Sequence, residues 1–124
     1  MLVEDGRTER AVAFKQLELS LRALAMSASR QLSLFPEDVV TADELARHFD
    51  RALAAVRAAY EHELSTPQVE ALTAVERKLR SMSRDGAALD LELWTDSALR
   101  SSEQWEAVRT LSLEAVTVLG AEVE

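Results

Sequence analysis

The residues with the clearest chemical potential in this 124-residue chain are its two histidines, His48 and His62. His62-Glu63 begins the zinc-protease pattern H-E-x-x-H, but Thr66 stands where the second histidine is needed. On one straight helix the two histidines would be about 21 Å apart, too far to share a metal ion. The chain has no cysteine and only three scattered glycines, so it offers no thiolate site and no phosphate-binding glycine loop. We therefore expect a protein that is not an enzyme and that binds no metal and no cofactor.

One histidine nevertheless lies in a segment suited to phosphate chemistry, His62-Glu63-Leu64-Ser65-Thr66-Pro67. This segment resembles the H-box of sensor histidine kinases, commonly H-E-L-R-T-P, and differs from it at Ser65. The resemblance implies that His62 accepts the phosphoryl group, Glu63 acts as base and Thr66 positions a water for dephosphorylation. This alternative function is a histidine phosphotransfer module. In the simpler interpretation, His62 is an exposed residue at a helix end, where a cation is favourable.

A second motif is Gln31-Leu32-Ser33-Leu34-Phe35. It resembles the short peptide by which bacterial replication and repair proteins bind the sliding clamp, with the consensus Q-L-[S/D]-L-F. In such peptides the glutamine makes polar contacts, while the closing leucine and aromatic residue fill an apolar pocket. Burial of Leu34 and Phe35 would each contribute about 1.5–3 kcal/mol, less the cost of ordering the peptide, which suits micromolar affinity. This hypothesis requires residues 31–35 to be extended and accessible to solvent.

The same pentapeptide also fits the core-facing side of a helix. Leu32 and Phe35 continue the apolar stripe of the preceding helix from Ala28 in steps of four and three. In this interpretation Pro36 ends the helix and both side chains are buried. A helix over 7–35 would be about 43 Å long, however, whereas the later helices would span only about 27 Å. Its end would lack packing partners, so the sequence leaves both interpretations open.

Apolar residues that recur at alternating steps of three and four predict helices along almost the whole chain. The predicted helices cover residues 9–30 (or 9–35 in the longer form), 42–64, 67–85 and 102–119. Three predicted N-caps mark the starts of the later helices: Thr41, Thr66 and Ser101.

The segment between the third and last predicted helices carries two competing patterns. Residues 89–94 alternate like a strand, but a strand here would have no partner because no other segment alternates. Leu91, Trp94 and Ala98 have helical spacing instead, which favours a short helix over 87–100. Short connections predict that successive helices run antiparallel. We therefore expect an all-α protein, an up-and-down four-helix bundle with an additional short helix, in a single domain over residues 1–124.

Acidic residues outnumber basic ones by 22 to 14, and six of the eight excess negative charges lie after residue 86. This balance argues against direct binding of nucleic acid or of an anionic membrane, and it suits a partner with a basic surface. No apolar run approaches the roughly 18 residues of a membrane span, and the chain begins without an apolar leader, so a cytoplasmic protein is expected.

The leading functional hypothesis is a non-enzymatic, acidic module for protein–protein interaction. Its suspected partner is a bacterial sliding clamp, bound through residues 31–35, or a protein with a basic surface. A further alternative is a structural bundle that forms homo-oligomers or hetero-oligomers through an apolar stripe.

Overall fold

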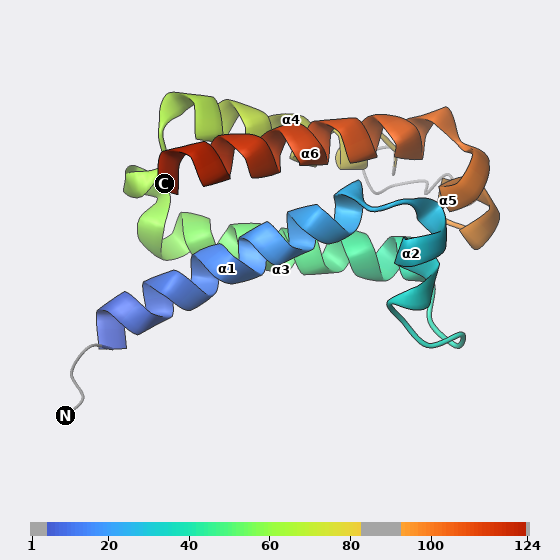
Figure 1. Cartoon of the computed structure of the whole chain (residues 1–124), viewed down its shortest axis with the longest axis horizontal. Coiled ribbons are helices and arrows are strands. Elements are labelled where there is room, and N and C mark those ends of the chain that lie inside the picture. The colour runs from blue at the N-terminus through green and yellow to red at the C-terminus, as the bar shows by residue number, and fades with distance from the viewer. Residues whose placement is uncertain (1–4, 83–92, 124) are drawn as a thin grey trace.

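The computed structural model describes residues 5–82 and 93–123 (Figure 1). Every regular element in these two ranges is helical, which confirms the predicted all-α class. The elements are α1 (Asp5–Ala25), α2 (Ala28–Ser33), α3 (Thr41–Tyr60), the 3-10 turn η1 (Glu61–Glu63), α4 (Thr66–Met82), α5 (Asp96–Ser101) and α6 (Glu103–Val123).

The four long helices lie side by side, and the short helices α2 and α5 lie together at one end of them (Figure 1). Along the chain, α1 runs towards this end, α3 runs away from it, α4 returns and α6 runs away again. The first helix packs against both α3 and α6, and α4 packs against α6. The first and last long helices of the chain are therefore direct neighbours.

Aliphatic and aromatic side chains at helical spacing form one core between the long helices. Its largest fully buried members include Leu17, Leu21 and Leu24 of α1, Phe49 and Leu53 of α3, Leu72 of α4 and Trp105 of α6. Trp105 meets Trp94 edge to face, with 5.3 Å between the ring centroids, and its Nε1 donates to the Leu93 carbonyl at 2.6 Å. The tryptophan pair thus ties the segment before α5 to the core.

The first predicted helix, 9–30 or 9–35, is wrong in its extent because the chain breaks at Met26 and Ser27. Ser27 has an extended backbone (φ −62°, ψ 157°), and its hydroxyl accepts a hydrogen bond from the Arg30 amide at 3.4 Å. Serine competes with the helical hydrogen bonds in this way, so it favours caps over helix interiors. The break turns α2 away from the axis of α1 (Figure 1), which removes the overhang that a continuous helix would have.

The predicted N-caps of α3 and α6 are each wrong by one position. Thr41 is buried inside the first turn of α3, and Val40 is the N-cap, without a side-chain cap bond. At α6, Ser102 rather than Ser101 accepts a hydrogen bond from the Gln104 amide, at 3.0 Å. At α3 the burial of Thr41 takes precedence over capping. At α6 the two adjacent serines are similar as caps, so packing decides which of them starts the helix.

The predicted cap at Thr66 is wrong for the same reason, since Ser65 caps α4. The Ser65 amide donates to Oε1 of Gln68 at 2.9 Å, and the Ser65 hydroxyl accepts from the Gln68 amide at 3.3 Å. These reciprocal bonds form a capping box. Two orphan amides at the start of α4 are thereby satisfied.

The remaining boundaries differ by a few residues. The predicted helix 42–64 ends as an α-helix at Tyr60 and continues as the 3-10 turn η1, and the predicted helix 67–85 begins at Thr66 and is described to Met82. The short helix expected over 87–100 covers Asp96–Ser101 instead, starting after Thr95, whose hydroxyl accepts from the Ala98 amide at 3.0 Å. Residues 83–92 lie outside the described part of the chain, and so does most of the segment with the strand-like pattern.

Candidate interaction surface

The pentapeptide 31–35 is divided between two environments. Residues 31–33 are helical, and Gln31 has no exposed surface, so the extended, accessible conformation required for clamp binding is wrong for this part. Leu34 follows the helix and is 45% exposed. Phe35 is half-buried, with its ring edge to face with the His48 imidazole at 5.4 Å between centroids. The alternative interpretation as one continuous helix is wrong, because the chain breaks at Met26 and Ser27. Its placement of Leu32 and Phe35 is right in part, because both side chains are half-buried and pack against the core.

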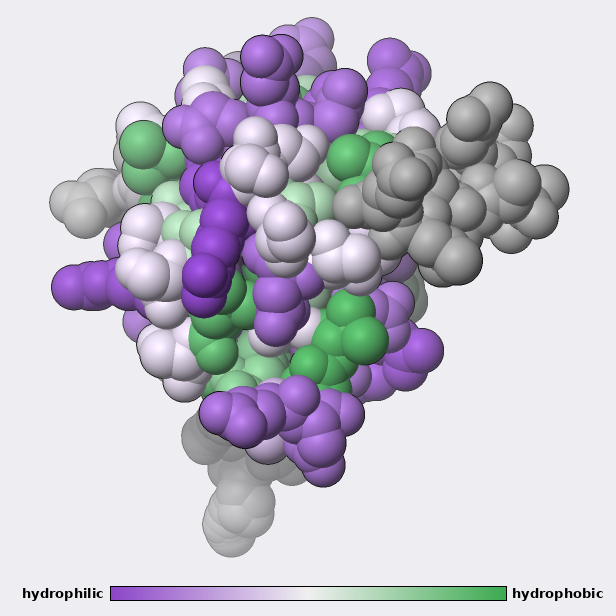
Figure 2. All heavy atoms as spheres, turned by 90° about the vertical axis from the view of Figure 1, so that its right-hand side faces the viewer, coloured by the Kyte–Doolittle hydropathy of each residue, from purple (hydrophilic) through white to green (hydrophobic). Residues whose placement is uncertain are grey.

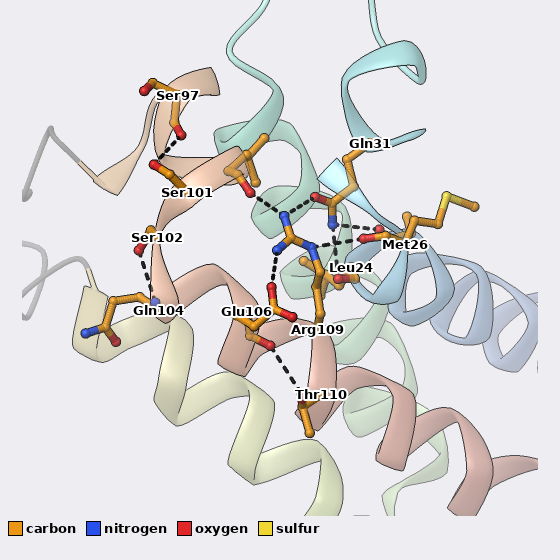
Figure 3. A network of polar contacts seen from close by, with 12 residues as sticks. Leu24, Met26, Gln31, Ser97, Ser101, Ser102, Gln104, Glu106, Arg109 and Thr110 are labelled. Carbon is orange, nitrogen blue, oxygen red and sulfur yellow. Dashed lines mark hydrogen bonds and ion pairs between the residues drawn. The ribbon is translucent and has the colours of Figure 1, made fainter. Parts of the chain in front are cut away.

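The Gln31 side chain forms hydrogen bonds with the C-terminal end of α1 (Figure 3). Its Nε2 donates to the carbonyls of Ala23 and Leu24, each at 3.0 Å, and its Oε1 accepts from Nη2 of Arg109 at 3.0 Å. The last carbonyls of a helix have no partner within the helix, and these bonds supply one. The amide is therefore fully engaged inside the chain.

Arg109 of α6 occupies the centre of this cluster (Figure 3), and its side chain is only 12% exposed. Its Nε donates to the Met26 carbonyl at 3.0 Å, its Nη1 to Oε1 of Glu106 at 3.1 Å, and its Nη2 also contacts the Leu99 carbonyl. The guanidinium thus lies where the C-terminal ends of α1 and α5 converge, and the partial negative charge of helix C-termini favours a cation there. This arrangement joins four helices and serves structure.

The exposed part of the pentapeptide borders an open groove of about 840 Å³ between α1 and α3. Leu34 and Phe35 line the groove beside residues of both helices. The α1 side includes Ala13, Ser20 and a series of residues in alternating steps of three and four: Glu9, Val12, Gln16, Leu19 and Ala23. This is the spacing of a helix face that packs against another helix.

The apolar members of this face are exposed, with Val12 at 53% and Leu19 at 46%. The adjacent face of α1 carries the buried stripe of Leu17, Leu21 and Leu24. The first helix is therefore apolar on two faces, of which the described part of the chain covers one. Seen from the end that carries α2 and α5, hydrophobic side chains also gather at the surface between polar ones (Figure 2).

Five residues of α3 line the other side of the groove: Leu45, His48, Arg51, Ala52 and Ala55. Nε2 of His48 lies 3.6 Å from Oε1 of Glu44, one helical turn away. Arg51 is exposed, and within residues 5–82 and 93–123 it makes no ion pair, nor does Glu9 on the α1 side. The groove thus combines apolar side chains with one positive charge, Arg51, and one negative charge, Glu9, that have no ion-pair partner among the described residues.

His62 lies in η1, at the opposite end of the long helices from α2. Its side chain is 78% exposed, and its Nε2 is 4.0 Å from Oε2 of Glu63. The Glu63 carboxylate also pairs with Arg10 of α1. Thr66, the first residue of α4, is exposed nearby in the chain. The three predicted phosphotransfer residues therefore surround a turn between two helices, instead of lying along one helix.

A second hollow, of about 500 Å³, lies between α3 and α4 and is lined by charged side chains. Nη1 of Arg57 lies 3.0 Å from the Glu76 carboxylate, and Nη2 of Arg80 lies 3.3 Å from it. Loss of solvent, and then the charge of Glu76, raise the pKa of Asp50 above its ordinary value of 3.8, while Arg80 opposes this shift. The charges in this hollow serve mainly to join the two helices.

Comparison with models of known protein families, with curated proteins and with solved structures finds no match to this chain. Within the described ranges, no helix is both long enough and apolar enough to cross a membrane. In the same ranges, no three histidine, aspartate or glutamate side chains are grouped so that they could hold a metal ion.

Sequence reasoning overlooks two features that leave a signal in the sequence. The series Glu9, Val12, Gln16, Leu19, Ala23 runs beside the core stripe at the same helical spacing, and it marks the groove face of α1. Arg109 is the one basic residue of α6, in a helix otherwise occupied by apolar, small and acidic residues. A lone cation on a largely apolar helix signals a buried polar contact.

Proposed function

We propose that this protein is a non-enzymatic module for protein–protein interaction and that the groove between α1 and α3 is its docking surface. The observation that carries the proposal is the second apolar face of α1, where Val12 and Leu19 are exposed beside Leu34. Exposed apolar surface that is contiguous and rimmed by polar residues is typical of interaction sites. In this proposal residues 1–124 form one cytoplasmic domain, an up-and-down bundle of the four long helices.

Burial of the exposed groove residues would supply the driving force. Each large aliphatic side chain contributes about 1.5–3 kcal/mol when it is fully buried, and these side chains are already about half covered. Val12 and Leu19 are seven residues apart, which separates them by about 10.5 Å along the helix. An amphipathic helix that docks in such a groove presents anchors at the same spacing.

Binding of a bacterial sliding clamp through residues 31–35 is a more specific form of this proposal. Leu34 is accessible for it, but Gln31 would have to leave its hydrogen bonds to Ala23, Leu24 and Arg109. Each buried polar group left unpaired costs about 1–3 kcal/mol, so α2 would have to unwind against a substantial cost. Binding to an immobilised clamp, abolished by the double change Leu34→Ala and Phe35→Ala in a still helical protein, would support this form. Absence of binding would contradict it.

The general proposal is tested by site-specific photocrosslinking in cells that make the protein. A benzophenone amino acid placed at Leu19 is expected to give a discrete protein adduct that Val12→Glu suppresses. The matched control is the same probe at Leu113, which is 59% exposed on α6 and does not line the groove. Equal adducts from both positions, or none from position 19, would overturn the proposal.

A second candidate function is histidine phosphotransfer through His62, favoured by the exposure of its imidazole beside Glu63. Nε2 would attack the phosphorus of an aspartyl phosphate on a receiver domain. The new N–P bond replaces the P–O bond, and the aspartate leaves as a carboxylate. Incubation with a phosphorylated receiver should then give acid-labile label that is lost in His62→Gln and kept in His48→Gln. Label that survives His62→Gln, or no label, would exclude this candidate.

A further inference from the structure

The spacing on the groove face of α1 indicates that a helix occupies the groove. Positions 9, 12, 16, 19 and 23 alternate in steps of three and four, as the a and d positions of a heptad do. Residues 9 to 23 extend over about 21 Å of helix, so the face accommodates about four helical turns. A small ligand would leave most of this length uncovered.

The two uncompensated charges lie at different levels along the groove, Glu9 near the start of α1 and Arg51 at the middle of α3. Because α3 runs antiparallel to α1, the first half of α3 is nearer to α2. This half includes His48, which contacts Phe35, and Arg51 lies at the middle of α3. Glu9 lies in the first half of α1, which points away from α2. A two-fold axis perpendicular to the groove exchanges its two ends. It would bring Glu9 of one copy towards Arg51 of the other, twice in each dimer.

The overall charge of the chain also favours approach through this face. Residues 5–60, which form α1, α2 and α3, contain eight acidic and eight basic side chains, so this segment is neutral. The full chain carries −8, and the excess negative charge therefore lies entirely on the remaining segments. Two copies that meet through α1 and α3 avoid the repulsion that other faces would produce.

We infer that the occupant of the groove is a second copy of this chain, in a symmetric dimer with the two α1 helices antiparallel. Val12 and Leu19 of each copy pack into the groove of the other, and Glu9 pairs with Arg51 across the axis. Such an isologous interface uses the same patch on both copies and closes on itself. The inference rests on the proposed function and names the partner of the same surface.

The experiment measures the mass of the purified full chain by light scattering and by sedimentation at tens of micromolar. The wild type is expected at twice its chain mass of 13.7 kDa. Arg51→Glu and Glu9→Arg should each weaken the dimer by roughly tenfold or more, because two attractive contacts become repulsive. An equimolar mixture of the two variants should recover the dimer, because both cross-copy pairs are then attractive again.

The matched control is Arg77→Glu, an exposed arginine of α4 outside the groove, which should leave the dimer intact. Leu19→Glu provides a second route to the monomer, and circular dichroism should show unchanged helix content in every variant. A monomeric wild type, or a dimer indifferent to all of the groove changes, would overturn the inference. If the probe at position 19 instead yields an adduct with a different protein, the second copy is excluded while the proposed interaction function stands.

Discussion

Two regions of this molecule reverse the usual placement of polar and apolar groups, and they do so in opposite ways. At the end that carries α2 and α5, an amide and a guanidinium, those of Gln31 and Arg109, are withdrawn from solvent. Along the groove between α1 and α3, large aliphatic side chains remain exposed. Buried polar groups and exposed apolar surface are the informative exceptions in a folded protein, because each departs from the default.

The difference between the two regions lies in where their partners are found. Every polar atom of the Gln31 side chain bonds within the chain, and the Arg109 guanidinium reaches carbonyls of α1 and α5. Val12 and Leu19 have no such cover from the described residues. The polar groups of the first region find their partners within the chain, so we assign them a structural role. The apolar side chains of the groove are left exposed by the described residues, so we assign them to interaction.

Removal of the guanidinium should produce the largest effect, because it breaks the completed region. We expect Arg109→Met to lower the free energy of unfolding by about 3 kcal/mol, since Gln31 and the Met26 carbonyl lose their partner while the aliphatic stem is kept. Urea denaturation followed by circular dichroism measures this. Arg100→Met, an exposed site on α5, should change stability by no more than about 0.5 kcal/mol. Equal effects at the two sites would refute the structural role.

The pentapeptide 31–35 contributes one residue to each region, Gln31 to the buried polar cluster and Leu34 to the groove, so the two regions can be compared by single substitutions. Gln31→Ala should cost about 2 kcal/mol, because it leaves helix-end carbonyls and the guanidinium unpaired. Leu34→Ala should cost less than about 1 kcal/mol, because its side chain is half exposed. The same denaturation experiment ranks them. The reverse order would show that Leu34 belongs to the core and that Gln31 is free to bind a partner.

A third substitution tests whether buried polar groups stabilise this protein only when they are hydrogen-bonded. Ser112 of α6 is fully buried, and within the described residues its hydroxyl has no hydrogen-bond partner. Ser112→Ala should therefore stabilise the protein by about 1 kcal/mol. Ser81→Ala, at an exposed helical site, gains helix propensity but loses the hydrogen bond from its hydroxyl to the Lys78 carbonyl, so its gain should be smaller. A loss of stability in Ser112→Ala would show that the Ser112 hydroxyl has a hydrogen-bond partner in the folded protein.

The smallest effect is expected at Asp50, where a charge is only partly withdrawn from solvent. Its pKa is raised in the folded state, chiefly by loss of solvent, so the ionised carboxyl opposes folding. The penalty is absent below the ordinary pKa of 3.8 and grows as the pH rises through the folded-state pKa. Asp50→Asn should thus raise the melting temperature by about 1 °C at pH 7 and leave it unchanged at pH 3. A gain of equal size at both pH values would exclude ionisation as the cause.

The long helices could be predicted from the sequence because one stripe of each must be buried. The residues Leu17, Leu21 and Leu24 repeat at helical spacing, and their burial confirms that signal. The break at Ser27 could not be predicted in the same way, since Ser29 and Ser33 offer the same local chemistry. The contact of Gln31 with Arg109, far away in the sequence, accompanies this break.

The candidate site was predictable only in part. The pentapeptide motif 31–35 predicts Leu34 and Phe35 as contact residues, and both line the groove. Its glutamine, Gln31, is buried inside the protein instead. The groove itself depends on how many faces of α1 are covered by other helices. A one-dimensional pattern shows that Val12 and Leu19 share a face, but it cannot show that this face is left uncovered.

The contact between Gln31 and Arg109 has a consequence for how the chain is made. These residues are 78 positions apart, so at about 5–20 residues per second the ribosome supplies the second roughly 4–16 s after the first. During that interval α1 has been synthesised without the helix that covers part of it, and the carbonyls at its end have no arginine to meet. The nascent chain therefore carries α1 without its α6 neighbour for most of its synthesis, and α3 is the one long helix available to cover it in the meantime until α4 and α6 follow.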